Sequence, residues 1–126
     1  MAENGASPSN QPAWPVELKL KRAERVLHIV FDDGAEYALP AEYLRVESPS
    51  AEVQGHSPSQ KQTVPGKAAV GIERIEPVGN YAVRLVFDDG HDTGIYSWRY
   101  LLELGREQEK RWADYLAALA KAGLTR

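Results

Sequence analysis

The sequence feature that most constrains the fold is an internal repeat. The segment 27–34 (LHIVFDDG) returns as 83–90 (VRLVFDDG), and the run Val-Phe-Asp-Asp-Gly is identical at an offset of 56. A weaker similarity follows each copy, since Tyr43-Leu44 is matched by Tyr100-Leu101 at an offset of 57. A chain that repeats a segment in this way is expected to build the same local structure twice.

Each copy is predicted to contain three strands joined by tight turns. Apolar residues alternate with His28 and Val30 in the first copy and with Arg84 and Val86 in the second. A period of two is typical of a strand. The Asp-Gly pair after each run favours a short hairpin, because glycine adopts positive φ without a steric penalty. The other expected strands cover residues 16–20, 36–39, 71–77 and 93–96.

The C-terminal part is predicted to form a pair of helices over about 97–122. Ser97 is a suitable N-cap, because its hydroxyl can accept a hydrogen bond from a free amide of the first turn. Glycine is unfavourable inside a helix, so Gly105 predicts a break or kink before a second helix over about 107–122, which closes at Gly123. We therefore expect an α+β fold of two pseudo-repeated antiparallel β-β-β-α units, in one domain over 14–126.

Two segments lack this periodicity. Residues 1–13 are rich in Ser, Asn, Pro and Gly and are expected to form a disordered tail. Residues 47–69 hold three prolines and show neither a helical nor a strand pattern. They predict a long loop, and loops of this length inside a small domain are often functional or partly disordered.

Composition excludes several classes of function. The 126 residues carry a net charge of −3, which gives no electrostatic reason to expect a nucleic-acid partner. No apolar run is long enough for a membrane helix, and no secretory signal is visible, so a cytoplasmic location is expected. The chain has no cysteine, which excludes disulfides and any metal site built on thiolates.

Four aspartates lie at the two hairpin turns: Asp32, Asp33, Asp88 and Asp89. Carboxylates at such positions can act as general acid and base or hold a hard cation. Aspartate also favours turns because its side chain binds local backbone amides. Since the same turn sequence occurs twice, we interpret these residues as turn formers rather than as catalysts.

The three histidines give no clear metal site. His28 is expected on the outer face of its strand, and His56 lies in the long loop. His91 and Asp92 form the only neighbouring histidine–carboxylate pair in the chain. No two histidines have a spacing typical of metal ligands, and no motif for a catalytic serine is present. The residues themselves therefore predict neither a cofactor nor a catalytic centre.

Several short motifs together resemble a known family. They are Trp14-Pro15, Leu39-Pro40, Tyr43-Leu44-Arg45, Ser48-Pro49-Ser50-Ala51-Glu52, Asp88-Asp89-Gly90-His91 and Thr93-Gly94-Ile95-Tyr96-Ser97-Trp98. In this order they resemble the gamma-butyrobetaine hydroxylase-like N-terminal domain, over about residues 14–105. The resemblance implies a small domain that accompanies iron-dependent hydroxylases and iron–sulfur carrier proteins, and that also stands alone in bacteria without an assigned activity.

The resemblance also implies where a metal would be bound. In the hydroxylases this domain resembles a zinc-stabilised module with three cysteines and one histidine. Here the cysteine positions hold Ser48, Ser50 and Val53, and only His91 is retained. Hydroxyls and a valine do not bind zinc usefully, so we expect no zinc. The hydroxylase iron belongs to a separate domain, which implies that this chain is not itself a hydroxylase.

Three functional hypotheses follow. The first is a non-enzymatic binding or adaptor domain that docks onto a protein partner, in particular iron–sulfur or redox machinery, through the 47–69 loop and the turn at His91. The second is an accessory domain that handles iron or zinc through His91 and Asp92. The third is a stand-alone enzyme that uses the paired aspartates. The candidate binding residues are Arg45, His56, Arg84, His91 and Asp92.

Overall fold

The computed structural model describes residues 14–126, so the predicted tail at 1–13 lies outside the described residues. The first unit consists of β1 (Pro15–Lys21), β2 (Val26–Phe31), β3 (Glu36–Pro40) and α1 (Ala41–Val46). The second consists of β4 (Ile72–Val78), β5 (Ala82–Phe87), β6 (Ile95–Ser97) and α3 (Trp98–Arg106). The last helix, α4, spans Gln108–Ala122. The predicted α+β fold with two β-β-β-α units and a C-terminal helix pair is confirmed.

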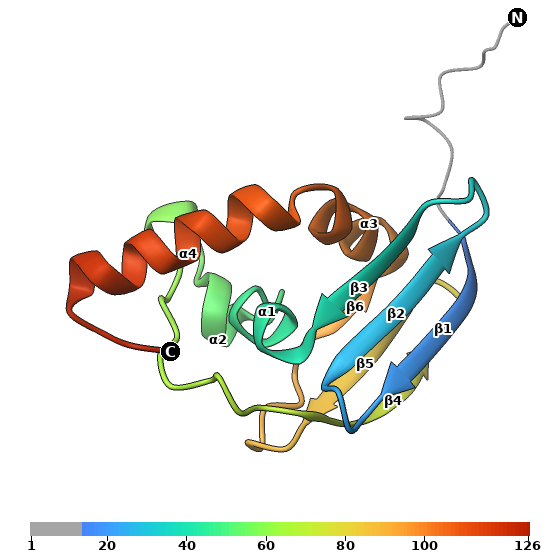
Figure 1. The fold of residues 1–126 in the computed structure, drawn as a ribbon, viewed down its shortest axis with the longest axis horizontal. Helices are drawn as coiled ribbons and strands as arrows, with labels where there is room; N and C mark the ends of the chain where they lie inside the picture. The colour runs from blue at the N-terminus through green and yellow to red at the C-terminus, as the bar shows by residue number, and fades with distance from the viewer. Residues whose placement is uncertain (1–13) are drawn as a thin grey trace, which may run out of the picture.

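The two units place their sheets against each other. Strands β1-β2-β3 form one antiparallel sheet and β4-β5-β6 form the other, and the helices lie on one side of the pair (Figure 1). The central strands supply Leu27, Ile29, Leu85 and Phe87 to a shared core, and each is at most 1% exposed. Burial of these side chains is the main stabilising contribution to a domain of this size.

The repeated Asp-Asp-Gly turns have nearly the same geometry. Gly34 has a φ of 88° and Gly90 a φ of 92°, a region that favours glycine. The amide of Gly34 donates to Phe31 O at 2.9 Å, and the amide of Gly90 donates to Phe87 O at 3.2 Å. The predicted hairpin chemistry is therefore present in both copies.

The repeat also relates the helices through a reciprocal exchange of hydrogen bonds. The Tyr43 hydroxyl on α1 donates to Leu104 O on α3 at 2.7 Å. The Tyr100 hydroxyl on α3 donates to Glu47 O, directly after α1, at 2.5 Å. Donors and acceptors are both related by the offset of 57. Each unit thus uses the same tyrosine to satisfy a carbonyl at the helix end of the other unit.

The helix ends follow the sequence in part. Ser97 caps α3 as predicted, since its Oγ accepts from the Tyr100 amide at 3.1 Å. Gly123 ends α4 in the left-handed conformation, also as predicted. The break falls at Glu107, so the second helix begins about where the sequence predicts, but Gly105 lies inside α3 and does not end it. Glycine occurs inside this helix because Tyr37 packs directly against it: a Cβ at Gly105 would lie 2.5 Å from Cγ of Tyr37.

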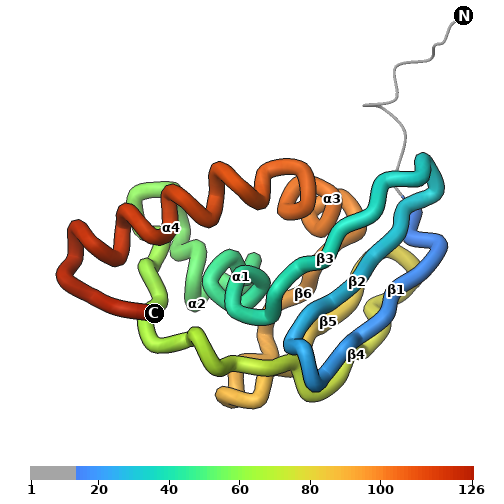
Figure 2. The backbone as a smooth tube through the Cα atoms, viewed as in Figure 1, coloured from blue at the N-terminus to red at the C-terminus, as the bar shows by residue number. Residues whose placement is uncertain are grey.

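The segment 47–69 differs from the predicted long loop. It contains α2 (Ala51–Gln54), capped by Ser50, and a 3₁₀ turn, η2 (Pro58–Gln60). After η2, the amide of Gln62 donates a hydrogen bond to Val53 O at 2.7 Å, so the chain folds back onto α2. In Figure 2 the segment after η2 passes from the helices to the start of β4. Within residues 14–126, no helix combines the length and hydropathy that a membrane span requires.

Candidate functional site

Residues from the 47–69 segment and from the second turn meet in a cluster of polar side chains. Ser48 Oγ lies 2.8 Å from Nε2 of His91, and Nδ1 of His91 lies 3.1 Å from a carboxylate oxygen of Glu52. Ser50 Oγ lies 2.8 Å from the hydroxyl of Thr93. Because a carboxylate only accepts, Nδ1 carries the proton in neutral His91, and Nε2 accepts from Ser48. We call Ser48, Glu52 and His91 the histidine joint.

An ion cluster lies beside the histidine joint. Arg45 Nε donates to Asp89 Oδ2 at 2.8 Å, and Lys67 Nζ donates to the same oxygen at 2.7 Å. The other oxygen of Asp89 accepts from the His91 amide at 3.0 Å. Burial would raise the pKa of Asp89, but the hydrogen bonds from Lys67, the His91 amide and Arg45 outweigh it and lower that pKa to about 2. Asp89 therefore acts as an ionised anchor for two cations.

The residues at the positions where the resemblance implies zinc ligands do not fit a zinc ion. Ser48 and Ser50 offer neutral hydroxyls in place of thiolates, and Ser48 uses its hydroxyl on the Nε2 atom of His91. Burial lowers the pKa of His91, and the charge of Arg45 lowers it further. The same charge opposes a second cation at this place. Within residues 14–126, no three histidine, aspartate or glutamate side chains converge as a metal site would require.

The histidine joint has the order of groups that serine hydrolases use, namely hydroxyl, imidazole and carboxylate. A nucleophile must reach its substrate, however, and Ser48 is 0% exposed. Its Oγ also accepts from the Ser50 amide at 3.2 Å, which is a structural contact of the turn before α2. This arrangement suits a hydrogen-bonded connection between two segments better than acyl transfer.

The hydrogen bonds of the histidine joint do not include the other predicted site residues, Arg84, Asp92 and His56. Arg84 binds Glu76 on the outer face of the second sheet, with Nε 2.9 Å from Oε1. Asp92 is exposed next to His91. His56 is exposed in the 47–69 segment, where its amide donates to Gln60 Oε1 at 2.8 Å. Of the five candidate binding residues, the structure brings together Arg45 and His91.

The paired aspartates make structural contacts, some within the turns and some with distant segments. Asp33 Oδ1 accepts from the Ala35 amide at 2.9 Å. Asp88 Oδ1 accepts from the Gly71 amide at 3.0 Å. The Asp33 contact is typical of aspartate in turns. The Asp88 contact instead joins the second turn to Gly71, 17 residues away, and Asp89 binds Arg45 and Lys67.

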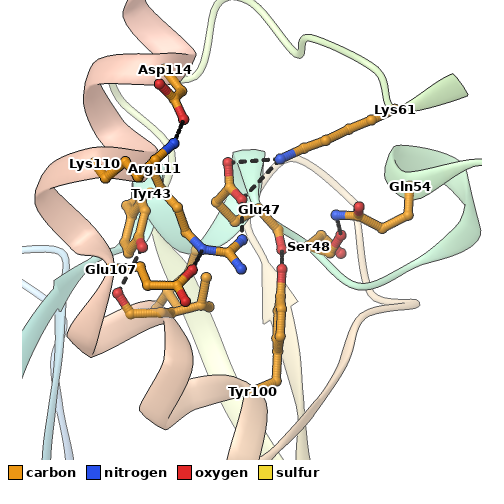
Figure 3. A network of polar contacts seen from close by, with 12 residues as sticks. Tyr43, Glu47, Ser48, Gln54, Lys61, Tyr100, Glu107, Lys110, Arg111 and Asp114 are labelled. Carbon is orange, nitrogen blue, oxygen red and sulfur yellow. Dashed lines mark hydrogen bonds and ion pairs between the residues drawn. The ribbon is translucent and has the colours of Figure 1, made fainter. Parts of the chain in front are cut away.

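A cleft that the sequence did not indicate lies between the 47–69 segment and α4. Its volume is about 590 Å³. The carboxylate of Glu47, only 4% exposed, accepts from Lys61 Nζ at 2.9 Å and from an Arg111 nitrogen at 2.8 Å (Figure 3). Arg111 also donates to Glu107 at 2.8 Å. A buried carboxylate with two cations therefore joins the 47–69 segment to the last helix.

These polar pairs were missed because each partner lies far away in the sequence. Glu47 and Arg111 are separated by 64 residues, and Arg45 and Asp89 by 44. Periodicity reports local structure and cannot pair charges across elements. The repeat does carry one signal, because Glu47 stands at the position of Leu104, which is fully buried. A charge at a position that is buried in the other copy indicates a buried ion pair.

Protonation of His91 is expected to destabilise the fold between pH 7 and pH 5. Burial lowers the pKa of His91 below 6.5, with a further contribution from Arg45, while Glu52 acts in the opposite direction. The unfolded chain then binds a proton more readily than the folded chain, so the stability is complete above the unfolded pKa and is lost as the pH falls. The slope contributed by one proton is at most about 1.4 kcal/mol per pH unit.

Urea unfolding at several pH values measures this effect, with His91→Gln as the matched variant. The wild-type protein should lose stability over this range more steeply than the variant. Asp89 gives a separate loss at lower pH, because its folded pKa is depressed from 3.8 to about 2. Equal slopes in the two proteins between pH 7 and pH 5 would show that His91 is not the titrating group.

Comparison with known proteins identifies similar chains. The family described as gamma-butyrobetaine hydroxylase-like, N-terminal, matches residues 18–102. One protein solved by NMR in solution is 47% identical with a TM-score of 0.80, over 92% of this chain and 91% of that chain. A second NMR structure is 50% identical with a TM-score of 0.80, over 95% of this chain and 89% of that chain.

A crystal structure extends the comparison to a protein with unknown function from Acidithiobacillus ferrooxidans ATCC 23270, which belongs to the DUF971 family. That protein is 41% identical to this chain with a TM-score of 0.61, over 72% of this chain and 91% of its own. No curated protein matches the chain.

Proposed function

The chain belongs to the gamma-butyrobetaine hydroxylase-like N-terminal family, and we propose that it is a non-enzymatic binding domain that docks onto a protein partner. The observation that carries this proposal is the union of the 47–69 segment with the second turn. Ser48 and Glu52 bind His91, and Lys67 binds Asp89, so two distant segments form one surface. We call this surface, residues 47–69 with 88–93, the docking face.

The polar side chains of the docking face support binding better than catalysis. The hydroxyl of the Ser48, His91 and Glu52 set is out of reach of a substrate, because Ser48 is fully buried. The cations Arg45 and Lys67 are both engaged by Asp89. His56, in the 47–69 segment, and Asp92, next to His91, are exposed residues of the docking face. A hydrogen-bonded interior with exposed polar groups beside it suits recognition of another protein, since side chains that are already held by hydrogen bonds lose little freedom on binding.

Metal handling, the alternative hypothesis, has less support. Its central residue would be His91, and both ring nitrogens of His91 already have partners. Arg45 places a positive charge nearby. The resemblance to domains that accompany iron–sulfur and redox proteins makes such proteins the first candidates as docking partners, without requiring this chain to bind a metal.

Site-specific photo-crosslinking in a native lysate tests the proposal. A photoreactive residue is placed at position 92 or 56 on the docking face, and at Lys19 on β1 as the matched control, where the side chain is 60% exposed. We expect one protein to be crosslinked from positions 92 and 56 but not from position 19. Once identified and purified, that protein should bind the wild-type chain in a direct titration and bind Asp92→Arg more weakly. Crosslinking only from position 19, or none from any position, would refute docking through this face.

A further inference from the structure

A second pocket lies beside α4. None of its lining residues belongs to the docking face, although the amide of Gly66 donates to Thr125 O, directly before Arg126, at 3.0 Å. The volume of the pocket is about 400 Å³, and it is lined by Pro40, Glu42, Tyr43, Gln108, Glu109, Trp112 and Arg126. The lining combines aromatic rings with two carboxylates, and Arg126 is its single cation. Arg126 comes from the segment that follows α4, and the pocket is otherwise built by α4, α1 and the residue before α1.

The guanidinium of Arg126 is held in this pocket by three contacts. Its Nε donates to one oxygen of Glu42 at 2.9 Å, and a terminal nitrogen donates to the other oxygen at 2.7 Å. The guanidinium carbon lies 5.5 Å from the ring centroid of Trp112. The carboxylate side chain of Glu42 is 8% exposed, whereas the side chain of Arg126 is 51% exposed. Glu42 is therefore buried within the fold, while the arginine that binds it is half exposed to solvent.

We propose that the pocket of Glu42 and Trp112 is a recognition site for an arginine side chain, which the chain fills with its own Arg126 and which accepts an arginine from a protein partner when Arg126 leaves. This inference goes beyond the proposed docking function and does not depend on the docking face.

The chemistry of the pocket selects a guanidinium over an ammonium group. Two parallel hydrogen bonds to one carboxylate match the planar fork of arginine, and lysine offers only a point charge. Arginine also stacks on the face of an indole ring. Withdrawal of Arg126 leaves the carboxylates of Glu42 and Glu109 in the lining without a cation from that set. A buried carboxylate that loses its partner favours a new cation at the same place.

The test uses the full chain with Arg126→Ala and a small probe, N-acetyl-arginine methylamide. Binding is followed through the indole N–H resonance of Trp112. We expect saturable binding with a dissociation constant on the order of a millimolar, as suits a ligand of this size. The lysine analogue should bind at least tenfold more weakly, and the wild-type chain should show no saturable shift at the same concentrations. Arg126→Ala should also show a lower Tm than the wild type, and the arginine probe should raise it.

Two further variants make the result specific. Adding Glu42→Gln to Arg126→Ala should abolish binding, and adding Lys121→Ala, an exposed change on α4, should leave it intact. If Arg126→Ala is poorly folded, Arg126→Lys replaces it, and this variant should bind the arginine probe more tightly than the wild-type chain does, because a lysine cannot make both hydrogen bonds to Glu42. Equal shifts with the lysine analogue, binding that survives Glu42→Gln, or no saturable binding to a folded variant would each overturn the proposal.

Discussion

Replacing Arg111 with alanine is expected to lower the free energy of unfolding by about 3 kcal/mol, because it leaves a buried carboxylate with one partner fewer. The carboxylate is that of Glu47, whose side chain is 4% exposed and accepts from Arg111 at 2.8 Å. Lys61 remains bound to it, but the Lys61 side chain is 38% exposed, so water weakens its attraction to the carboxylate. The variant also loses the contact of the guanidinium with the Tyr100 ring, at 5.7 Å from its centroid. Urea unfolding measures the loss.

The matched control is Lys110→Ala, one position away on α4. Lys110 is 79% exposed and binds Asp114 in an exposed pair, so its loss should be much smaller. The double variant Glu47→Leu/Arg111→Leu should recover most of the stability, since replacing both partners removes the unpaired charge. If Arg111→Ala is no less stable than Lys110→Ala, the pair at Glu47 does not hold the 47–69 segment to α4.

The second large effect is expected from Gly105→Ala, which should destabilise the fold by about 2 kcal/mol. Alanine normally stabilises a helix relative to glycine by about 1 kcal/mol, so the expected sign opposes helix propensity. The reason is that the new Cβ would lie between 2.5 and 2.7 Å from three atoms of the Tyr37 ring. The ring atoms nearest the backbone are involved, so the ring cannot turn away freely.

A double-mutant cycle with Tyr37→Ala isolates this contact. In the Tyr37→Ala background the clash is absent, and Gly105→Ala should become neutral or stabilising. Denaturant unfolding of the four proteins provides the comparison. A loss that is the same in both backgrounds would mean that backbone conformation at position 105, and not the Tyr37 ring, requires glycine.

The sequence predicted most of the fold because the fold is built from local signals. Strand alternation and the Asp-Gly turns define the hairpins, and Ser97 and Gly123 mark helix ends by the chemistry of their caps. The second helix begins close to the predicted Glu107, but Gly105 does not end the first helix, since glycine at this position reflects the approach of Tyr37 from another element. Helix α2 was missed because four residues are too few to show a helical period.

The candidate site was less predictable because its contacts join elements across the repeat. The repeat relates Gly105 to Ser48 and Tyr37 to Gly94 at the same offset of 57. A Cβ at Gly94 would lie 2.6 Å from Ser48 Oγ, so both of these repeat-related pairs are in close contact. At each related position, one copy holds glycine and the other copy holds a larger residue. Such complementarity becomes visible only when the two units are packed together. The role of His91 depends in the same way on Glu52, which lies 39 residues away.

The central claim is that the histidine joint, and not a metal ion, connects the 47–69 segment to the second turn. The most direct measurement is the metal content of untagged protein, purified without chelator, together with its Tm before and after addition of EDTA or zinc. We predict less than about 0.1 equivalent of bound metal and a Tm that neither reagent changes, since no part of the folding free energy comes from metal binding. About one equivalent of a tightly held metal, with a Tm that EDTA lowers, would contradict the account.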